Sequence, residues 1–180
     1  MEKLDCRIVH TLTGIWLTTP ARRLGPVPAT EPTPDSYVLV EKAGTPALRI
    51  DVYLKPDALY RETMALHWGD WIAVGCSDSV YLVPLTDTSV REVSLGDSGP
   101  WDYFSGFWPT DEILLAVSGR GLVRIEPDGS VRWRNDNLGL DGIDVKSVSA
   151  GAITGLGDWD PPGGWKPFEI DTDTGAALLA

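Results

Sequence analysis

One β-hairpin pattern constrains the fold of this chain more than any other feature. Residues 121–134 read Gly-Leu-Val-Arg-Ile-Glu-Pro-Asp-Gly-Ser-Val-Arg-Trp-Arg, with apolar residues at every second position on both sides of a central Pro-Asp-Gly. Proline fixes φ and glycine tolerates a positive φ, so Pro-Asp-Gly closes a short turn between two antiparallel strands. The pattern therefore predicts a tight hairpin of two short strands.

The hairpin pattern recurs at a regular step. Similar hairpins are predicted from Ser79 and from Gly164, which lie 42 residues before and 43 residues after Gly121. Each hairpin is preceded by two further β-rich apolar runs, so each repeat holds four short strands. A period of roughly 40–45 residues with four strands is the spacing of radially stacked propeller blades. The predicted repeat units are residues 63–96, 103–136 and 144–180.

Two of these repeats resemble a known family. They are similar to the repeats of quinoprotein-type (PQQ-like) and WD40-like β-propellers. The stretches that carry the resemblance are Gly-Leu-Val-Arg-Ile-Glu-Pro-Asp-Gly-Ser-Val-Arg-Trp and Lys-Pro-Phe-Glu-Ile-Asp-Thr-Asp-Thr-Gly-Ala-Ala-Leu. The resemblance covers residues 103–136 and 144–180 well, residues 63–96 loosely and the first sixty hardly at all. It implies an all-β fold, a small propeller-like array of three to four four-stranded antiparallel sheets. A β-sandwich or an open partial propeller is the alternative.

The chain also departs from that family. Glu126 stands where the family usually has Asp, and the last hairpin lacks the closing Trp. Enzymes of the family that hold the quinone use a much larger ring of blades. The resemblance therefore implies no cofactor for this chain.

The first third of the chain follows the repeat least well. Residues 7–19 are β-rich, with Gly14 as a predicted turn or bulge. Five prolines between residues 20 and 34 indicate a loop, and residues 37–54 predict another hairpin. We expect residues 1–180 to form a single all-β domain, in which residues 1–56 make a divergent first sheet with the Pro-rich loop 20–34.

Charge is distributed unevenly along the chain. The net charge is −11, yet residues 1–60 carry seven basic and seven acidic side chains, so the whole excess lies on residues 61–180. A negative potential repels phosphate backbones, and nucleic-acid binding is not expected. The same potential favours encounter with a basic partner, although acidic surfaces are common and plain solubility is the more ordinary reason for one.

Neither a leader nor a membrane segment is expected. Met1-Glu-Lys-Leu-Asp has acidic residues where a signal peptide has basic ones, and no apolar run approaches the roughly 18–20 residues of a membrane span. Cys6 and Cys76 show no paired spacing. They are expected to be free thiols in a reducing cytoplasm, a single disulfide being the alternative. We therefore expect a cytoplasmic protein without membrane contact.

Catalytic and metal-binding patterns are weak. His10 and His67 are the only histidines, and neither lies in a recognisable base motif. The sequence Asp171-x-Asp173-x-Gly175 begins like a calcium loop but has Gly at the fifth position. We expect no metal site and no cofactor, and an enzyme is less favoured than a binding protein.

Two stretches are candidates for a binding surface. The first stretch, residues 100–109, holds five aromatic residues. Within it, residues 103–108 are predicted to form a strand that is buried on both faces. The residues just before this strand, Trp101 and Asp102, are therefore the candidates for an exposed contact. Residues 157–165 interrupt the last repeat, and insertions on the loop face of such scaffolds carry recognition surface. Two prolines stiffen this insertion, and its Trp159 either meets a basic partner or caps the sheet end. The predicted binding residues are Trp101, Asp102, Asp158, Trp159, Asp160, Pro161, Pro162 and Trp165.

Three functions from different classes fit these features. The favoured one is a non-catalytic acidic protein-binding module, for example an immunity-type inhibitor of a basic partner or toxin. The second is a small-molecule-binding protein or hydrolase that uses carboxylates at one end of the sheets. The third is a self-assembling structural protein whose open sheet edges pair with other copies. The carboxylates of the second hypothesis are Asp141, Asp144, Asp158 and Asp160.

Overall fold

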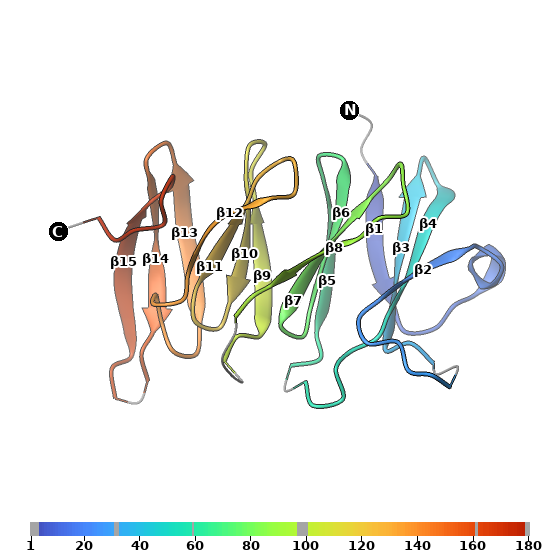
Figure 1. Ribbon diagram of the computed structural model, residues 1–180, viewed down its shortest axis with the longest axis horizontal. Coiled ribbons are helices and arrows are strands. Elements are labelled where there is room, and N and C mark those ends of the chain that lie inside the picture. Colours follow the sequence, from blue (N-terminus) through green and yellow to red (C-terminus); the bar gives the residue numbers. More distant parts are fainter. Residues whose placement is uncertain (1–3, 31–32, 59, 97–100, 161, 179–180) are drawn as a thin grey trace. The chain divides into compact units, whose positions relative to one another are not determined.

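The chain is built from short β-strands. The computed structural model describes residues 4–30, 33–58, 60–96, 101–160 and 162–178, which contain fifteen strands, one 3-10 turn and no α-helix. The strands form four small sheets, and none of these closes into a barrel. The predicted all-β class is confirmed. Figure 1 shows that each sheet consists of strands of neighbouring colour, because each is built from one continuous part of the chain.

The chain divides into two compact units. The first comprises Met1–Ser77 with Tyr81–Glu92, and the second comprises Asp78–Val80 with Val93–Ala180. Each unit contains its own cluster of buried apolar side chains.

The first sheet has the strand order β1-β3-β4-β2. Its strands are β1 (Asp5–Val9), β2 (Ala21–Leu24), β3 (Ser36–Lys42) and β4 (Thr45–Val52), and β2 alone runs parallel to its neighbour β4. A short 3-10 turn, η1 (Gly14–Leu17), lies between β1 and β2 and starts at a glycine with φ of 59°.

One expectation for this region needs correction. The segment 20–34 is not entirely loop, because β2 lies inside it. The four residues of β2 contain no proline, so their backbone N–H groups can pair with β4. The prolines that follow at 26 and 28 end the strand.

The second sheet has the order β5-β6-β7-β8. Its strands are β5 (Thr63–Trp68), β6 (Trp71–Cys76), β7 (Ser79–Pro84) and β8 (Arg91–Ser94), at the positions that the repeat predicts. Alternate apolar side chains of this sheet and the first form one buried cluster, which includes Val38, Ile50, Ile72 and Val83. The predicted free thiols are confirmed, since neither Cys6 nor Cys76 forms a disulfide.

The third sheet has the order β12-β11-β10-β9 and contains the hairpin at which the repeat is clearest. Its strands are β9 (Phe104–Pro109), β10 (Leu114–Ser118), β11 (Leu122–Ile125) and β12 (Val131–Asn135). Gly129 adopts a φ of 80° in the turn, and the Glu126 N–H donates to the Ser130 carbonyl at 2.9 Å. The Pro-Asp-Gly turn thus closes the predicted hairpin.

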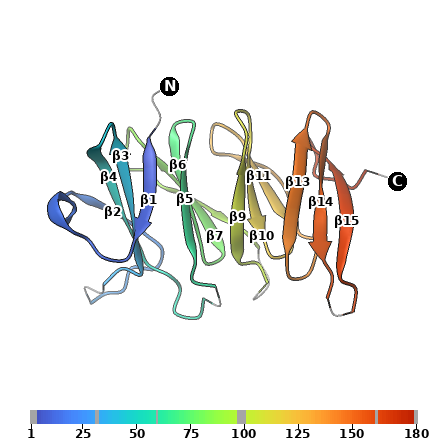
Figure 2. The same ribbon diagram turned by 180° about the vertical axis from the view of Figure 1, so that it is seen from behind.

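The fourth sheet has three strands where the repeat predicts four. It contains β13 (Ile143–Ser149), β14 (Ala152–Asp158) and β15 (Trp165–Asp171), with β15 at one edge (Figure 2). Within the described residues, the expected fourth strand is reduced to a bridge between Ala177 and Ile170. The Ala-Ala pair at 176–177 brings almost no apolar side chain to bury, unlike the Trp-bearing β12 in the third sheet. Side chains of the third and fourth sheets share one core, which includes Leu115 and Ile153.

Candidate functional site

A cavity of about 500 Å³ in the second unit brings together three of the predicted binding residues. Trp101, Asp158 and Asp160 line this cavity although they come from distant parts of the chain. Asp141, one of the carboxylates predicted for a small-molecule site, lines it as well. We call this cavity the acidic cavity; among the described residues its lining is Trp101, Arg120, Leu140, Asp141, Asp158 and Asp160.

Backbone contacts hold one wall of the acidic cavity in place. The Leu140 N–H donates to the Asp158 carbonyl at 2.6 Å, and the Asp158 N–H donates to the Gly142 carbonyl at 2.8 Å. This close approach requires Gly157, since a Cβ there would lie 1.6 Å from the Leu138 carbonyl oxygen. The loop before β13 is therefore fixed to the end of β14, which sets Asp141 beside Asp158.

A tyrosine fixes the Asp141 carboxylate. The Tyr103 hydroxyl donates to Oδ1 of Asp141 at 3.0 Å and approaches its carbonyl at 3.3 Å. Tyr103 precedes β9, so this contact connects the two sheets of the second unit at the cavity. The carboxylate is consequently held in one orientation before any ligand arrives.

The mouth of the acidic cavity is both apolar and charged. Trp101 is 45% exposed, and Leu140 is exposed to a similar degree. Three carboxylates face one guanidinium, that of Arg120, which leaves two negative charges in excess. A cation with an apolar stem suits such a lining, because the stem packs on Trp and Leu while the charge meets the carboxylates.

The insertion between β14 and β15 is an ordered turn over most of its described residues. The Trp159 N–H donates to the Gly164 carbonyl at 3.0 Å, and the Asp160 N–H donates to Oδ1 of Asp158 at 3.1 Å. The ring of Trp159 lies 5.9 Å from Nζ of Lys166, a cation–π contact. Trp159 is half-buried and turns toward β15, so it does not join its two flanking carboxylates in the acidic cavity.

The remaining predicted binding residues are dispersed. Asp102 was expected to be exposed, and this is wrong: only 4% of it is accessible. Its carboxylate packs so closely on Gly96 that a Cβ there would lie 2.0 Å from the Asp102 Cγ. Trp165 is exposed and lies outside the cavity, Pro162 is exposed in the insertion, and Pro161 falls outside the described residues.

Of the four carboxylates predicted for a small-molecule site, the structure brings three together in the acidic cavity and leaves Asp144 outside it. Asp144 forms an ion pair with Lys146, whose Nζ lies 2.5 Å from its Oδ2, and does not line the acidic cavity. The spacing of aspartates in the sequence carried no information about which of them meet, because they stand on different strands and loops.

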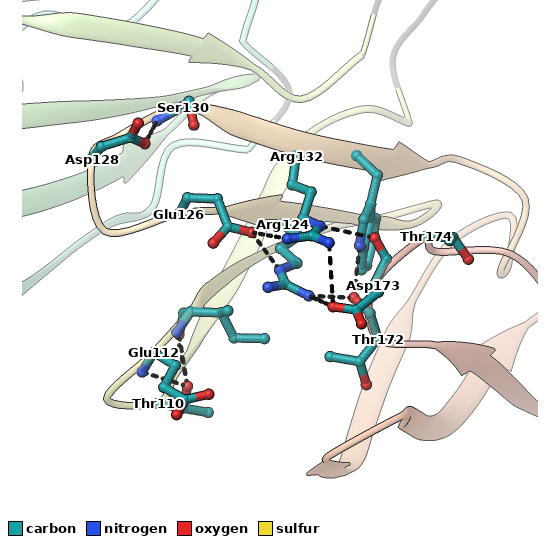
Figure 3. Close-up of polar contacts among 12 residues, drawn as sticks. Thr110, Glu112, Arg124, Glu126, Asp128, Ser130, Arg132, Thr172, Asp173 and Thr174 are labelled. Carbon is teal, nitrogen blue, oxygen red and sulfur yellow. Dashed lines mark hydrogen bonds and ion pairs between the residues drawn. The ribbon is translucent and has the colours of Figure 1, made fainter.

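Sequence reasoning missed a cluster of ion pairs around Arg124 (Figure 3). The Arg124 side chain is only 8% exposed; its Nε lies 2.8 Å from Glu126, and its Nη1 lies 3.0 Å from Asp173. Nη1 also donates to the Thr172 carbonyl at 2.6 Å, which accepts a second hydrogen bond from the Trp133 indole at 2.8 Å. The cluster connects β11 and β12 with the turn after β15. One signal in the sequence could have indicated this cluster: Arg124 stands between the apolar Val123 and Ile125 on a predicted strand, directly before the acidic Glu126.

No metal centre is apparent in the part of the chain that the structure describes, where no three His, Cys, Asp or Glu side chains gather closely enough to hold an ion. The described helical segment is likewise too short to cross a membrane. Fold and cavity together define an all-β scaffold with an acidic cavity in its second unit. No protein-family model and no curated protein sequence matches this chain.

Proposed function

We propose that this protein is a non-catalytic binding module that docks a basic protein through the acidic cavity. One observation supports the proposal: exposed apolar side chains and carboxylates line the same cavity. The apolar side chains are those of Trp101 and Leu140, and the carboxylates are those of Asp141, Asp158 and Asp160. A lysine or arginine side chain of the partner would lay its stem on the apolar pair and its charge among the carboxylates.

The charge of the second unit supports the same partner chemistry. That unit carries fifteen acidic and six basic side chains, a net of −9, whereas the first unit has a net of only −2. A surface of that sign accelerates association with a basic protein and discriminates against acidic ones. An inhibitor that shields a basic toxin domain is one role for such a module.

The experiment is affinity capture from the source cell with three forms of the full chain: wild type, Trp101→Ala and the control Trp165→Ala. Both tryptophans are exposed, but only Trp101 lines the cavity. We expect one basic protein at near-equal amounts with wild type and with Trp165→Ala, and its loss with Trp101→Ala. The amount of captured protein should fall as the salt concentration rises, because salt screens the long-range attraction between the acidic surface and the basic partner.

The opposite outcome would refute the proposal. If no protein is retained in stoichiometric amounts, or if Trp101→Ala retains the same protein as wild type, the cavity is not the docking site.

A second candidate function uses the same cavity for a small cationic molecule. Its volume of about 500 Å³ falls within the roughly 300–1,000 Å³ of small-ligand pockets. Titration calorimetry with arginine methyl ester and with spermidine separates the two candidates. Saturable binding of either compound at micromolar concentration, together with no captured protein, would favour the small-molecule function.

A further inference from the structure

Arg120 lines the acidic cavity, but a purely cationic guest would leave its guanidinium without a partner. Among the described residues, the Arg120 side chain forms no ion pair or hydrogen bond, although three carboxylates line the same cavity. Its Nε is buried and lacks a hydrogen-bond partner within that part of the chain. A buried N–H without an acceptor is unfavourable, so a guest that supplies the acceptor gains affinity.

The backbone of Arg120 is fixed by three hydrogen bonds. Its N–H donates to the Ser118 hydroxyl at 3.3 Å. Its carbonyl accepts from the Leu138 N–H at 3.1 Å and from the Gly139 N–H at 3.2 Å. These contacts join the turn between β10 and β11 to the loop that carries the next wall of the acidic cavity, so the guanidinium and that wall are positioned together.

The two neighbours of Arg120 leave it as the one side chain of this turn. A Cβ at Gly119 would lie 2.6 Å from the Trp101 carbonyl oxygen, and a Cβ at Gly121 would lie 1.8 Å from the Asn135 carbonyl oxygen. Glycine is therefore required on both sides by close backbone approach. The turn is packed so tightly that the base of the Arg120 side chain is held in place before a guest arrives.

The charges of the acidic cavity require a guest with both signs of charge. A cation alone is attracted by the three carboxylates and repelled by Arg120, whereas an anion alone meets the opposite balance. A guest that places a positive group among the carboxylates and a negative group at the guanidinium satisfies every charge of the described lining.

The size of the cavity restricts where those two charges lie in the guest. A volume of about 500 Å³ holds only one or two residues of a partner. A lysine or arginine at the end of a chain carries both charges on one residue, a cation on an apolar stem and the α-carboxylate. The stem packs on Trp101 and Leu140, and the α-carboxylate pairs with Arg120, whose planar guanidinium suits a carboxylate.

We propose that the acidic cavity receives the C-terminal residue of the basic partner, a lysine or arginine whose α-carboxylate binds Arg120. Capture of a terminal carboxylate is an established mode of peptide recognition. Arg120 is then the specificity-determining residue, because it selects a chain end over the lysines and arginines within a chain. This inference rests on the docking function proposed above and names the part of the partner that enters the cavity.

The probes are three peptides with a fluorescent label at the N-terminus, titrated with the full chain and followed by anisotropy. They are Gly-Ser-Gly-Leu-Lys with a free α-carboxylate, the same peptide as its C-terminal amide, and Gly-Ser-Gly-Leu-Ala with a free α-carboxylate. We expect the lysine acid to bind about tenfold more tightly than the lysine amide, equivalent to ~1.4 kcal/mol. The alanine acid should bind more weakly than both lysine peptides.

Three variants assign the preference to Arg120. Arg120→Gln should bring the affinity of the lysine acid down to that of the amide, and Arg120→Lys should keep part of the preference because it keeps the charge. Arg132→Gln removes the same charge from an arginine of the same unit that is 47% exposed and lies outside the cavity. This control should keep the tenfold preference.

A carboxylate variant separates this inference from the docking function. Asp141→Asn should weaken the lysine acid and the lysine amide by the same factor, since both place an ammonium in the cavity. Equal affinity of the two lysine peptides, with both weakened by Asp141→Asn, would overturn the inference and leave the docking function in place with an internal basic residue as the guest.

Three other results would also overturn the inference. The first is a preference for the acid that survives Arg120→Gln. The second is free lysine that binds as tightly as the lysine acid, which would make an amino acid the guest. The third is binding of neither lysine peptide, in which case the affinity capture with Trp101→Ala still decides the docking function independently.

Discussion

Replacement of Arg124 by alanine should be the most damaging single change in the ion-pair cluster of the second unit. The guanidinium meets Glu126 at 2.8 Å and Asp173 at 3.0 Å, and it donates to the Thr172 carbonyl at 2.6 Å. The alanine variant removes all three contacts at once. It also leaves the carboxylate of Glu126, which is mostly buried, without its nearest countercharge.

The magnitude follows from burial. Removal of one partner from a buried ion pair costs roughly 3–5 kcal/mol, because a charge remains without compensation. Asp173 is 67% exposed and regains water when Arg124 is lost, so the lower end applies. We expect a loss of about 3 kcal/mol. Arg132 approaches the same two carboxylates at 3.8 and 3.5 Å but is 47% exposed, and Arg132→Ala should cost less than about 1 kcal/mol.

Urea denaturation followed by tryptophan fluorescence measures the difference. With a urea dependence of roughly 2 kcal/mol/M, a loss of about 3 kcal/mol lowers the unfolding midpoint by about 1.5 M. Glu126→Gln in the Arg124→Ala background should recover part of the loss, since it removes the stranded charge. Midpoints that are equal for Arg124→Ala and Arg132→Ala would refute the reasoning.

Two further predictions concern single side chains. Burial, and to a smaller extent the negative charge of Asp5, raises the pKa of Cys6 to about 11. Because the thiolate is the reactive form, alkylation of Cys6 by iodoacetamide at pH 8 should be much slower than that of free cysteine, and its rate should keep rising with pH up to about 11. Hydrogen bonds from Thr174 lower the pKa of Asp171. Its ionised form therefore stabilises the fold above the unfolded pKa of about 3.9, and the unfolding midpoints of wild type and Asp171→Asn should converge as pH falls below that value.

The strands of this protein were largely predictable because they depend on local patterns. Alternation of apolar residues and the turn at Pro127-Asp128-Gly129 act over a few residues, so the sequence places the third sheet nearly residue by residue. The first sheet was less predictable, because β2 pairs in parallel with β4 and lies in a Pro-rich segment. Such pairing brings together segments that no local signal connects.

The candidate site was predictable only in part. The sequence selected Trp101 for an exposed contact and placed Asp158 and Asp160 in a binding insertion, and all three line one cavity. It also grouped Asp102 with Trp101, although one is buried and the other exposed. Adjacent residues in a turn can point in opposite directions, and their burial depends on what packs against them from elsewhere, here Gly96.

The sequence by itself determined the strands of the second and third sheets, three of the four strands expected in the fourth sheet, and the concentration of negative charge on the later part of the chain. Only the tertiary structure decided that Trp159 turns toward Lys166, that Asp141 joins Asp158, and that Arg124 is buried among carboxylates. Strand formation follows from interactions between near neighbours, whereas the composition of a cavity depends on distances between segments that lie tens of residues apart.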